Sequence, residues 1–394
     1  MKRLPTASVV DAVDVEALHG WVVDRARHLV DDLVALAELE TPSDDRELLA
    51  KGVTFVEEWV LDRLGAPARR VRHESAEHGS TLVLDYSGTG QRQVVGLGHY
   101  DTVFGAGTTR SWPVRVDGDR VSGPGVFDMK GGLVQLMWSL RALHELGVPR
   151  PPVRLVLNGD EEIGSPFSRP VLEQAVADAA AVLVFEASAD GAVKTARKGV
   201  GLFDVTARGV ESHAGLDPEA GASAIDELAR VITTLHAGAD LKRGTSINVG
   251  VVSGGTRANV VAGFAQANID VRVATAEEEA RVDALLASLA PRDERVKLEV
   301  SGGWNRPVMP RSDEIGRMYA LARRAAARLG VDLREASVGG ASDGNFAAAL
   351  GIPVLDGFGA VGGGAHARHE HVSITGMVER TALAASVIAA FAVE

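Results

Sequence analysis

Three consecutive acids, Asp160, Glu161 and Glu162, follow an apolar segment and come shortly before a glycine, Gly164. Carboxylates side by side repel one another, so the pKa of each should be raised unless a cation lies among them. A charge run can also be a plain turn that faces solvent. The triplet is therefore either a metal-binding element or a surface turn, and other residues must decide between the two.

Other polar groups share this position after an apolar segment. His99 and Asp101 are two residues apart, and residues i and i+2 of a strand point to the same side. Taken singly, Asp128 could cap the helix predicted after it, and Glu186 could be a surface acid at a strand end. Three more candidates lie close together near the C-terminus: His366, His369 and His371.

Together these histidines and acids form a set of nitrogen and oxygen donors. The chain has no cysteine, so disulfides and thiolate nucleophiles are excluded, and any metal must be held by His, Asp and Glu. Such a donor set suits Zn²⁺, with Co²⁺ or Mn²⁺ as alternatives. We therefore expect a metal centre.

The composition narrows the classes of partner. The 394 residues include 41 basic and 53 acidic ones, and the formal charge of -12 argues against a nucleic-acid or anionic-membrane surface. A small substrate fits better. No apolar segment reaches membrane-spanning length, and the N-terminal residues lack the apolar region of a secretory signal. We therefore expect a cytoplasmic protein.

The candidate ligands must be positioned by secondary structure. Apolar residues at helical spacing predict helices over about 15–40 and 46–64. Short β-rich segments then alternate with helices up to about residue 187, which is typical of an α/β domain with a largely parallel sheet. Loops at the carboxyl ends of such strands face a common crevice, and the acidic triplet follows such an end.

The pattern changes near residue 198. Residues 198–306 read as β-α-β-β-α-β, a small ferredoxin-like α+β domain. The α/β pattern then resumes with a helix that Ser312 can cap. Because a chain of this length favours two domains, we predict an α/β domain formed by 1–197 and 307–394 and interrupted by an inserted domain, 198–306.

Six motifs, in this order and spacing, resemble the zinc peptidase family M20, particularly its glutamate carboxypeptidase branch: "HYDTV", "GPGVFDMKGG", "NGDEEIGS", "FEAS", "GVESHAG" and "GGGAHARHEHV". The resemblance extends from about residue 20 to the end of the chain. It implies a zinc-peptidase-like catalytic domain with a mixed, largely parallel sheet, into which a smaller lid domain that dimerises is inserted.

The resemblance also implies a ligand set for two Zn²⁺ ions per subunit. Asp128 would bridge the two ions. His99 and Glu186 would complete one site, and Glu162 and His366 would complete the other. His369 and His371 remain the alternatives to His366. The family further implies a cis peptide bond between Asp128 and Met129.

Two acids next to the ligands receive other roles from the resemblance. Glu161 would act as general base toward the attacking water and pass the proton to the leaving amine. Asp101 would accept the second N–H of His99 and so fix its tautomer. On this interpretation the members of the acidic triplet have different tasks.

The inserted domain would contribute substrate contacts. His213, in "GVESHAG", and Asn259, in "GGTRANVV", match positions that contact substrate in the family, and His213 could donate to the developing oxyanion. We favour Arg272 for the substrate carboxylate, because a guanidinium can bind it through two parallel bonds; the alternative is a surface arginine at a strand end. Weaker candidates for the same pocket are Lys194, Arg306 and Gly340.

The implied activity is hydrolysis of an amide or peptide bond next to an amino acid with a free carboxylate, as in a glutamate carboxypeptidase. An N-acyl amino acid amidohydrolase is the alternative, and a non-catalytic ligand-binding relative would be expected to have lost Glu161. The family implies a homodimer through the lid domain, in which His213 reaches the active site of the other subunit; the alternative is a monomer in which His213 serves its own site. The residues do not specify the acyl group, the preferred C-terminal amino acid or the native metal.

Overall fold

The computed structural model describes residues 4–393, which divide into two compact units. The first unit comprises the residues up to Ala196, Arg311–Val338, and Ser342 onward. The second unit comprises Arg197–Pro310 with Gly339–Ala341. Met309 stays with the second unit because its backbone pairs with that of Arg197 through two hydrogen bonds of 3.0 and 3.1 Å.

A six-stranded mixed sheet forms the centre of the first unit. In spatial order its strands are β1 (Arg69–His73), β2 (Thr81–Tyr86), β6 (Val153–Asn158), β3 (Val94–His99), β7 (Ala181–Val184) and β14 (Val354–Leu355). The four strands from β6 to β14 run parallel, whereas β1 and β2 pair antiparallel. The carboxyl ends of β6, β3 and β7 therefore lie side by side.

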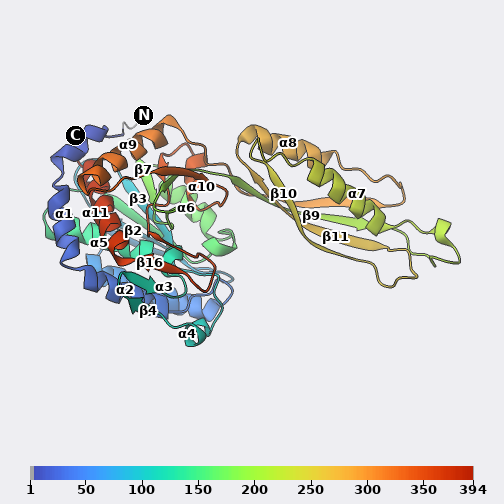
Figure 1. Cartoon of the computed structure of the whole chain (residues 1–394), viewed down its shortest axis with the longest axis horizontal. Helices are drawn as coiled ribbons and strands as arrows, with labels where there is room; N and C mark the ends of the chain where they lie inside the picture. Colours follow the sequence, from blue (N-terminus) through green and yellow to red (C-terminus); the bar gives the residue numbers. More distant parts are fainter. Residues whose placement is uncertain (1–3, 394) are drawn as a thin grey trace. The chain divides into compact units, whose positions relative to one another are not determined.

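Helices cover both faces of this sheet (Figure 1). One group contains α1 (Val15–Val23), α2 (Ala26–Glu38), α3 (Arg46–Leu64), α5 (Gly131–Glu145) and α11 (Ile374–Ala390). The other group contains α6 (Ser168–Val176) and α10 (Gly344–Ala349). Helix α9 (Asp313–Arg328) packs against α11 and begins after Ser312, whose hydroxyl accepts the N–H of Ile315 as the sequence predicts.

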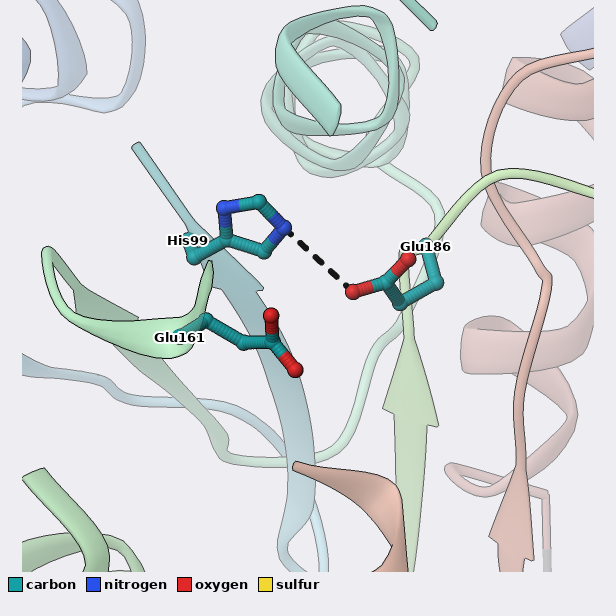
Figure 2. Close-up of side chains that lie close together, drawn as sticks. All are labelled: His99, Glu161 and Glu186. Atoms are coloured by element: carbon teal, nitrogen blue, oxygen red, sulfur yellow. Dashed lines mark ion pairs between the residues drawn. The ribbon is translucent and has the colours of Figure 1, made fainter. Parts of the chain in front are cut away.

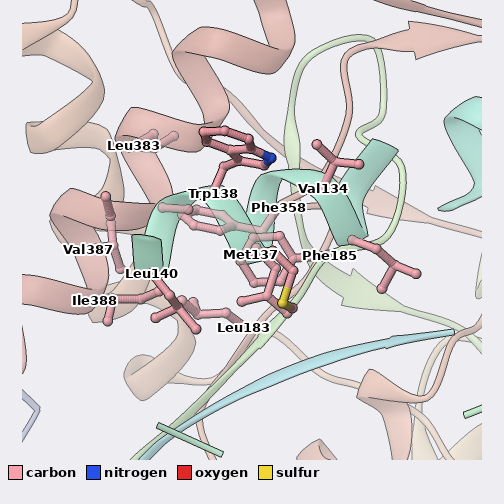
Figure 3. Packing of buried hydrophobic residues seen from close by; sticks show 14 of the residues in the cluster. Val134, Met137, Trp138, Leu140, Leu183, Phe185, Phe358, Leu383, Val387 and Ile388 are labelled. Atoms are coloured by element: carbon pink, nitrogen blue, oxygen red, sulfur yellow. The ribbon is translucent and has the colours of Figure 1, made fainter. Parts of the chain in front are cut away.

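The core of the first unit lies around α5, which is buried on nearly all sides. Figure 3 shows side chains of α5, among them Met137 and Leu140, between residues from α11 and residues in and after β7. Phe185 packs edge-on against Phe358, with ring centroids 5.9 Å apart. This packing holds α5, which begins three residues after Asp128.

Smaller elements complete the first unit, except that the last residue of β8, Arg197, belongs to the second unit. They are η1 (Ala7–Ala12), α4 (Thr108–Ser111), β4 (Arg115–Asp117), β5 (Arg120–Ser122), η2 (Val126–Lys130), η3 (Glu161–Ile163), β8 (Val193–Arg197), β13 (Glu335–Val338), β15 (Gly362–Gly363) and β16 (His371–Ser373). Strands β15, β16, β5 and β4 form a second sheet, and β13 pairs with β8.

The second unit has the predicted β-α-β-β-α-β order. Its elements are β9 (Gly199–Arg208), η4 (Pro218–Ala220), α7 (Ala224–Ala237), β10 (Ser246–Gly254), β11 (Phe264–Val273), α8 (Ala276–Ala287) and β12 (Lys297–Arg306). The strands form an antiparallel sheet in the order β10-β11-β9-β12, with α7 and α8 on one face (Figure 1). Ser223 and Thr275 cap the two helices by accepting backbone N–H groups. Among the described residues of both units, no helix is long and apolar enough to cross a membrane.

Candidate metal centre

Polar side chains gather at the carboxyl ends of three adjacent strands of the first unit. His99 is the last residue of β3, the acidic triplet follows β6, and Glu186 follows β7. Asp128 lies in η2, directly before α5, and its peptide bond to Met129 is cis, as the resemblance implies. His366 lies between β15 and β16 and has a left-handed backbone with φ of 61°.

Asp128 lies between two histidines. Its Oδ1 is 3.3 Å from Nε2 of His99, and its Oδ2 is 3.4 Å from Nε2 of His366. Each histidine also faces a second carboxylate: Oε1 of Glu186 is 3.4 Å from His99, and Oε2 of Glu162 is 3.1 Å from His366. The five residues thus form two groups that share Asp128.

Glu161 faces the same space. One of its carboxylate oxygens lies within 4.8 Å of donor atoms of both His99 and Glu186. Figure 2 shows these three side chains facing a common space, with Glu161 on the turn that follows β6. A second group of donor atoms within 4.8 Å of one another comes from His99, Asp128 and Glu162.

The carboxylates of the centre stabilise positive charge on the two histidines beside them. Burial opposes charging of His99, yet hydrogen bonds with Asp101 and other carboxylates raise its pKa well above the ordinary value. Hydrogen bonds with Asp128 and Glu162 raise the pKa of His366 to about 10. Burial would raise the pKa of Asp128, but the two histidines hold it far below its usual range. Burial raises the pKa of Glu162 to about 8.

Divalent cations fit this donor set. Oε1 of Glu162 is buried and has no hydrogen-bond partner within the described structure. The donors are imidazole nitrogens and carboxylate oxygens that face one another at 3.1–3.4 Å. Such donors suit Zn²⁺. The three carboxylates outnumber the two imidazoles, so protonation of both histidines would still leave negative charge for a cation to balance.

Asp101 supports both sides of the centre. Nδ1 of His99 lies 3.1 Å from the carbonyl oxygen of Asp101 and 3.3 Å from its Oδ1. The carboxylate of Asp101 also accepts the backbone N–H groups of Glu161 and Glu162, at 3.3 and 3.2 Å, and the hydroxyl of Ser43 at 2.8 Å. Since Nδ1–H donates to Asp101, Nε2 is left for a metal.

The acidic triplet is not a solvated turn. Asp160 is 0% exposed, and its Oδ2 accepts the N–H groups of Phe167 and Ser168 at 2.8 and 3.0 Å. Burial raises the pKa of Asp160. Asp160 thus holds the loop that carries Glu161 and Glu162, whereas the carboxylates of Glu161 and Glu162 lie among the donor atoms of the centre.

His366 differs from the two alternatives in its surroundings. Its side chain is half-exposed, at 53%, but Nε2 faces Glu162 and Asp128. Nδ1 of His371 instead lies 3.1 Å from the carbonyl oxygen of His369, whose backbone also accepts from Arg120. The geometry thus brings His366 to the centre.

His213 and Asn259 lie together in the second unit. The N–H of Ala214 donates to the carbonyl of Asn259 at 3.0 Å, and His213 forms a bridge with Val260. Nδ1 of His213 accepts two backbone N–H groups at 3.1 Å each. The proton of the neutral ring is therefore on Nε2, which leaves that atom as a donor.

The candidates for carboxylate binding have partners of their own. Nε and Nη2 of Arg272 bind both oxygens of Asp270, at 2.8 and 2.7 Å. Arg306 is buried and donates to Oδ1 of Asn305 at 3.2 Å. The carbonyl of Gly340 accepts from Arg197, and Lys194 pairs through its backbone with Asp356. Their roles toward a substrate stay predictions.

Three further residues near the centre were absent from the predicted site. They are Ser43, Lys130 and Glu370. Lys130 is buried, burial lowers its pKa to about 8, and its Nζ donates to the carbonyl of Leu39 at 2.7 Å. The sequence signal was weak in each case: a serine after a proline, a lysine after Asp128, and an acid between two histidines.

The chain resembles known hydrolases over most of its length. It is 30% identical to carboxypeptidase G2 of Pseudomonas sp. (strain RS-16) over 378 residues, covering 93% of this chain and 89% of the relative. It is also 30% identical to acetylornithine deacetylase of Myxococcus xanthus over 225 residues, covering 54% of this chain and 57% of the relative.

Solved structures show the same fold at low identity. Aminopeptidase PepT of Bacillus cereus matches with a TM-score of 0.74 at 20% identity, covering 93% of this chain and 99% of that one. The Bacillus subtilis YXEP protein, described as a dinuclear metal-binding peptidase of family M20, has a TM-score of 0.66 at 15% identity, covering 92% and 97%. The predicted α/β fold class is thus confirmed. Residues 97–390 match peptidase family M20/M25/M40, and the chain therefore belongs to this family of metal-dependent hydrolases.

Proposed function

We propose that the chain is a di-zinc hydrolase that cleaves an amide or peptide bond next to an amino acid with a free carboxylate. The observation that carries this proposal is the position of Asp128, whose two oxygens face two different histidines, each with a second carboxylate of its own. A carboxylate shared in this way suits a dinuclear site.

The ligand assignment follows these groups. His99, Asp128 and Glu186 would hold one Zn²⁺, and Asp128, Glu162 and His366 would hold the other; Co²⁺ or Mn²⁺ would suit the same donors. When bound, the two cations supply a Lewis acid for the scissile carbonyl and lower the pKa of water.

Glu161 is the proposed general base. Its carboxylate comes within 4.8 Å of donor atoms on His99 and Glu186 and is placed by a backbone hydrogen bond to Asp101. From there it would take the proton of the attacking water and deliver it to the leaving amine. Asp101 would orient His99 and the Glu161–Glu162 backbone together.

Residues of the second unit would bind the substrate. Nε2–H of His213 would donate to the developing oxyanion. Asn259 lies beside His213, because its carbonyl accepts the N–H of the next residue, Ala214. To bind the substrate carboxylate through Nε and Nη2, Arg272 would have to release Asp270, whose two oxygens occupy these donors. Lys194, Arg306 and Gly340 remain the other proposed contacts.

The similarity to carboxypeptidase G2 supports the exopeptidase activity, because it covers nearly the whole of both chains. An N-acyl amino acid amidohydrolase is the second candidate, favoured by the similarity to acetylornithine deacetylase and, at 27% identity, to an N-acetyl-L-citrulline deacetylase of Xanthomonas campestris. Both reactions would use the same centre and differ in the acyl group.

A homodimer formed through the second unit is a further part of the proposal. Strand β10 lies at an edge of the sheet, and its Val251 and Val252 are more than half exposed. Such edges are either protected or paired with another chain. Light scattering tests the dimer, and cell fractionation tests the predicted cytoplasmic location.

A substrate panel on the purified, zinc-loaded enzyme tests the activity. Dipeptides, folate-type glutamate conjugates and N-acyl amino acids should be compared by kcat/KM, with metal content measured on the same preparation. Hydrolysis of a substrate with a free C-terminal carboxylate, but not of its amide, is expected. Equal rates on acid and amide would contradict the carboxylate requirement, and a metal-loaded enzyme that hydrolysed none of them would favour the non-catalytic relative.

A further inference from the structure

Two loops of the first unit carry the proposed ligands Asp128 and His366. We call residues 123–130 the Asp128 loop and residues 362–371 the His366 loop. They are far apart in the sequence and are joined by pairing of β5 with β16, in which Ser122 faces His371. Residue Glu370, at the end of the His366 loop, lies where the two loops meet.

The carboxylate of Glu370 binds the backbone of the Asp128 loop. Oε1 accepts the N–H groups of Phe127 and Asp128 at 2.8 and 2.9 Å, and Oε2 accepts that of Gly125 at 3.2 Å. Glu370 is 0% exposed, so water does not compete for these donors. Amides that converge on one carboxylate form an anion-binding concavity in the backbone.

The backbone of Glu370 is held as well. Its N–H donates to the carbonyl of Ala367 at 3.0 Å, within the turn that follows His366, and its carbonyl accepts the N–H of Gly123 at 3.3 Å. Glu370 is therefore tied to His366 by a short turn and to Asp128 by its side chain. A shift of Glu370 would change the spacing between the two loops.

We infer that Glu370 is a positioning residue, which sets Asp128 against His366 and so reduces the cost of gathering the metal ligands. The inference rests on the proposed assignment of Asp128 and His366 as ligands. Glu370 acts through the backbone amides of the Asp128 loop, not by contact with a metal or substrate. Loss of such supporting contacts costs metal sites about 10–100-fold in affinity.

The variant Glu370→Gln tests this role with little change in shape. The amide would present an N–H₂ group to backbone N–H donors, so at least one of the three hydrogen bonds would be lost. The matched control is Glu227→Gln in the second unit. Glu227 is 7% exposed and accepts the backbone N–H groups of Arg292 and Asp293 at 3.0 and 3.1 Å.

Metal affinity is measured on each purified enzyme by competition of Zn²⁺ with a chromogenic chelator, alongside kcat and KM. Glu370→Gln should weaken zinc binding about 10–100-fold and lower kcat more than it changes KM. Glu227→Gln should keep wild-type zinc affinity. Wild-type affinity in Glu370→Gln, or an equal loss in both variants, would overturn the inference.

Failure of the proposed site is separable from failure of this inference. Asp128→Ala should lose zinc if Asp128 is a ligand; retention of both metals would refute the ligand assignment itself. Loss of zinc in Asp128→Ala combined with an unchanged Glu370→Gln would refute only the role of Glu370.

Hydrogen exchange on the wild-type enzyme covers the case in which Glu370→Gln does not fold. If Glu370 holds the Asp128 loop, the amides of Gly125, Phe127 and Asp128 should stay protected after the metals are removed with a chelator. Exchange in this peptide that becomes as fast as in exposed loops after chelation would show that metal, and not Glu370, holds the loop.

Discussion

Nε2 of His366 lies 3.1 Å from Oε2 of Glu162, although the two residues are 204 positions apart in the chain and His366 is half-exposed. Because the side chain of His366 is half-exposed, it can be replaced by alanine without disturbing the core, so this proposed ligand can be tested by substitution. The two other histidines of the same segment offer a matched comparison.

His366→Ala should lose one of two zinc ions per chain, because only the Glu162 side of the centre loses its imidazole. His369→Ala and His371→Ala should keep both zinc ions. Among the described residues, the histidine that pairs with Glu162 and Asp128 is His366, whereas Nδ1 of His371 lies against the carbonyl of His369. Metal analysis of the three dialysed variants is the measurement. A variant of His369 or His371 that lost a metal while His366→Ala kept two would reassign the ligand.

Glu161→Gln should keep both metals and lower kcat by about 10²–10⁴-fold, because only proton transfer is removed. Its neighbour provides the contrast: Glu162→Gln should lose metal affinity, since Oε2 of Glu162 faces His366 and its Oε1 is buried without a hydrogen-bond partner within the described structure. Metal content and kcat are measured on the same samples. Near-normal kcat in a metal-loaded Glu161→Gln would assign the base elsewhere.

Catalysis should need two chains if His213 serves the partner subunit. Mixing His213→Ala with Glu161→Ala by co-expression would then give heterodimers with one complete site, and about a quarter of wild-type activity at random pairing. If His213 serves its own chain, every site lacks one group. Heterodimers shown to form, but without recovered activity, would exclude action in trans.

Stability of the first unit should depend on the charge of Asp32. Burial would raise the pKa of Asp32, but hydrogen bonds from Arg63 and Trp138 hold it below the ordinary value of 3.8. The stability from these bonds is therefore present above that value and is lost as pH falls through the lower folded pKa. Asp32→Asn should cost about 1.5–3 kcal/mol near neutral pH.

Urea unfolding followed by tryptophan fluorescence measures this difference across the pH range. The difference in the free energy of unfolding between wild type and Asp32→Asn should shrink once the pH is below 3.8. Asp31→Asn is the control, because Asp31 is exposed on the same helix and such changes stay within about 0.5 kcal/mol. A difference that is constant down to low pH would show that packing, not charge, is responsible.

Local chemistry in the sequence determined the elements and the residue types of the centre. Apolar periodicity and the cap Ser312 indicate where a helix begins, because these signals act within a few residues of each other, whereas the caps Ser223 and Thr275 are seen in the folded chain. The same local patterns place His99 and Glu186 at strand ends. The absence of cysteine restricts a metal to nitrogen and oxygen donors.

The tertiary structure decided which of these groups meet. The carboxylate of Glu370 reaches the N–H of Asp128 across 242 residues of sequence, and that of Asp101 reaches the amides of Glu161 and Glu162 across about 60. Periodicity encodes which face of an element is buried, but the partner found there depends on strand order and on how loops close. That is why the ligand types and the role of Asp101 toward His99 were readable from the sequence, whereas Glu370 and the bonds from the Glu161–Glu162 backbone to Asp101 became visible only in the folded chain.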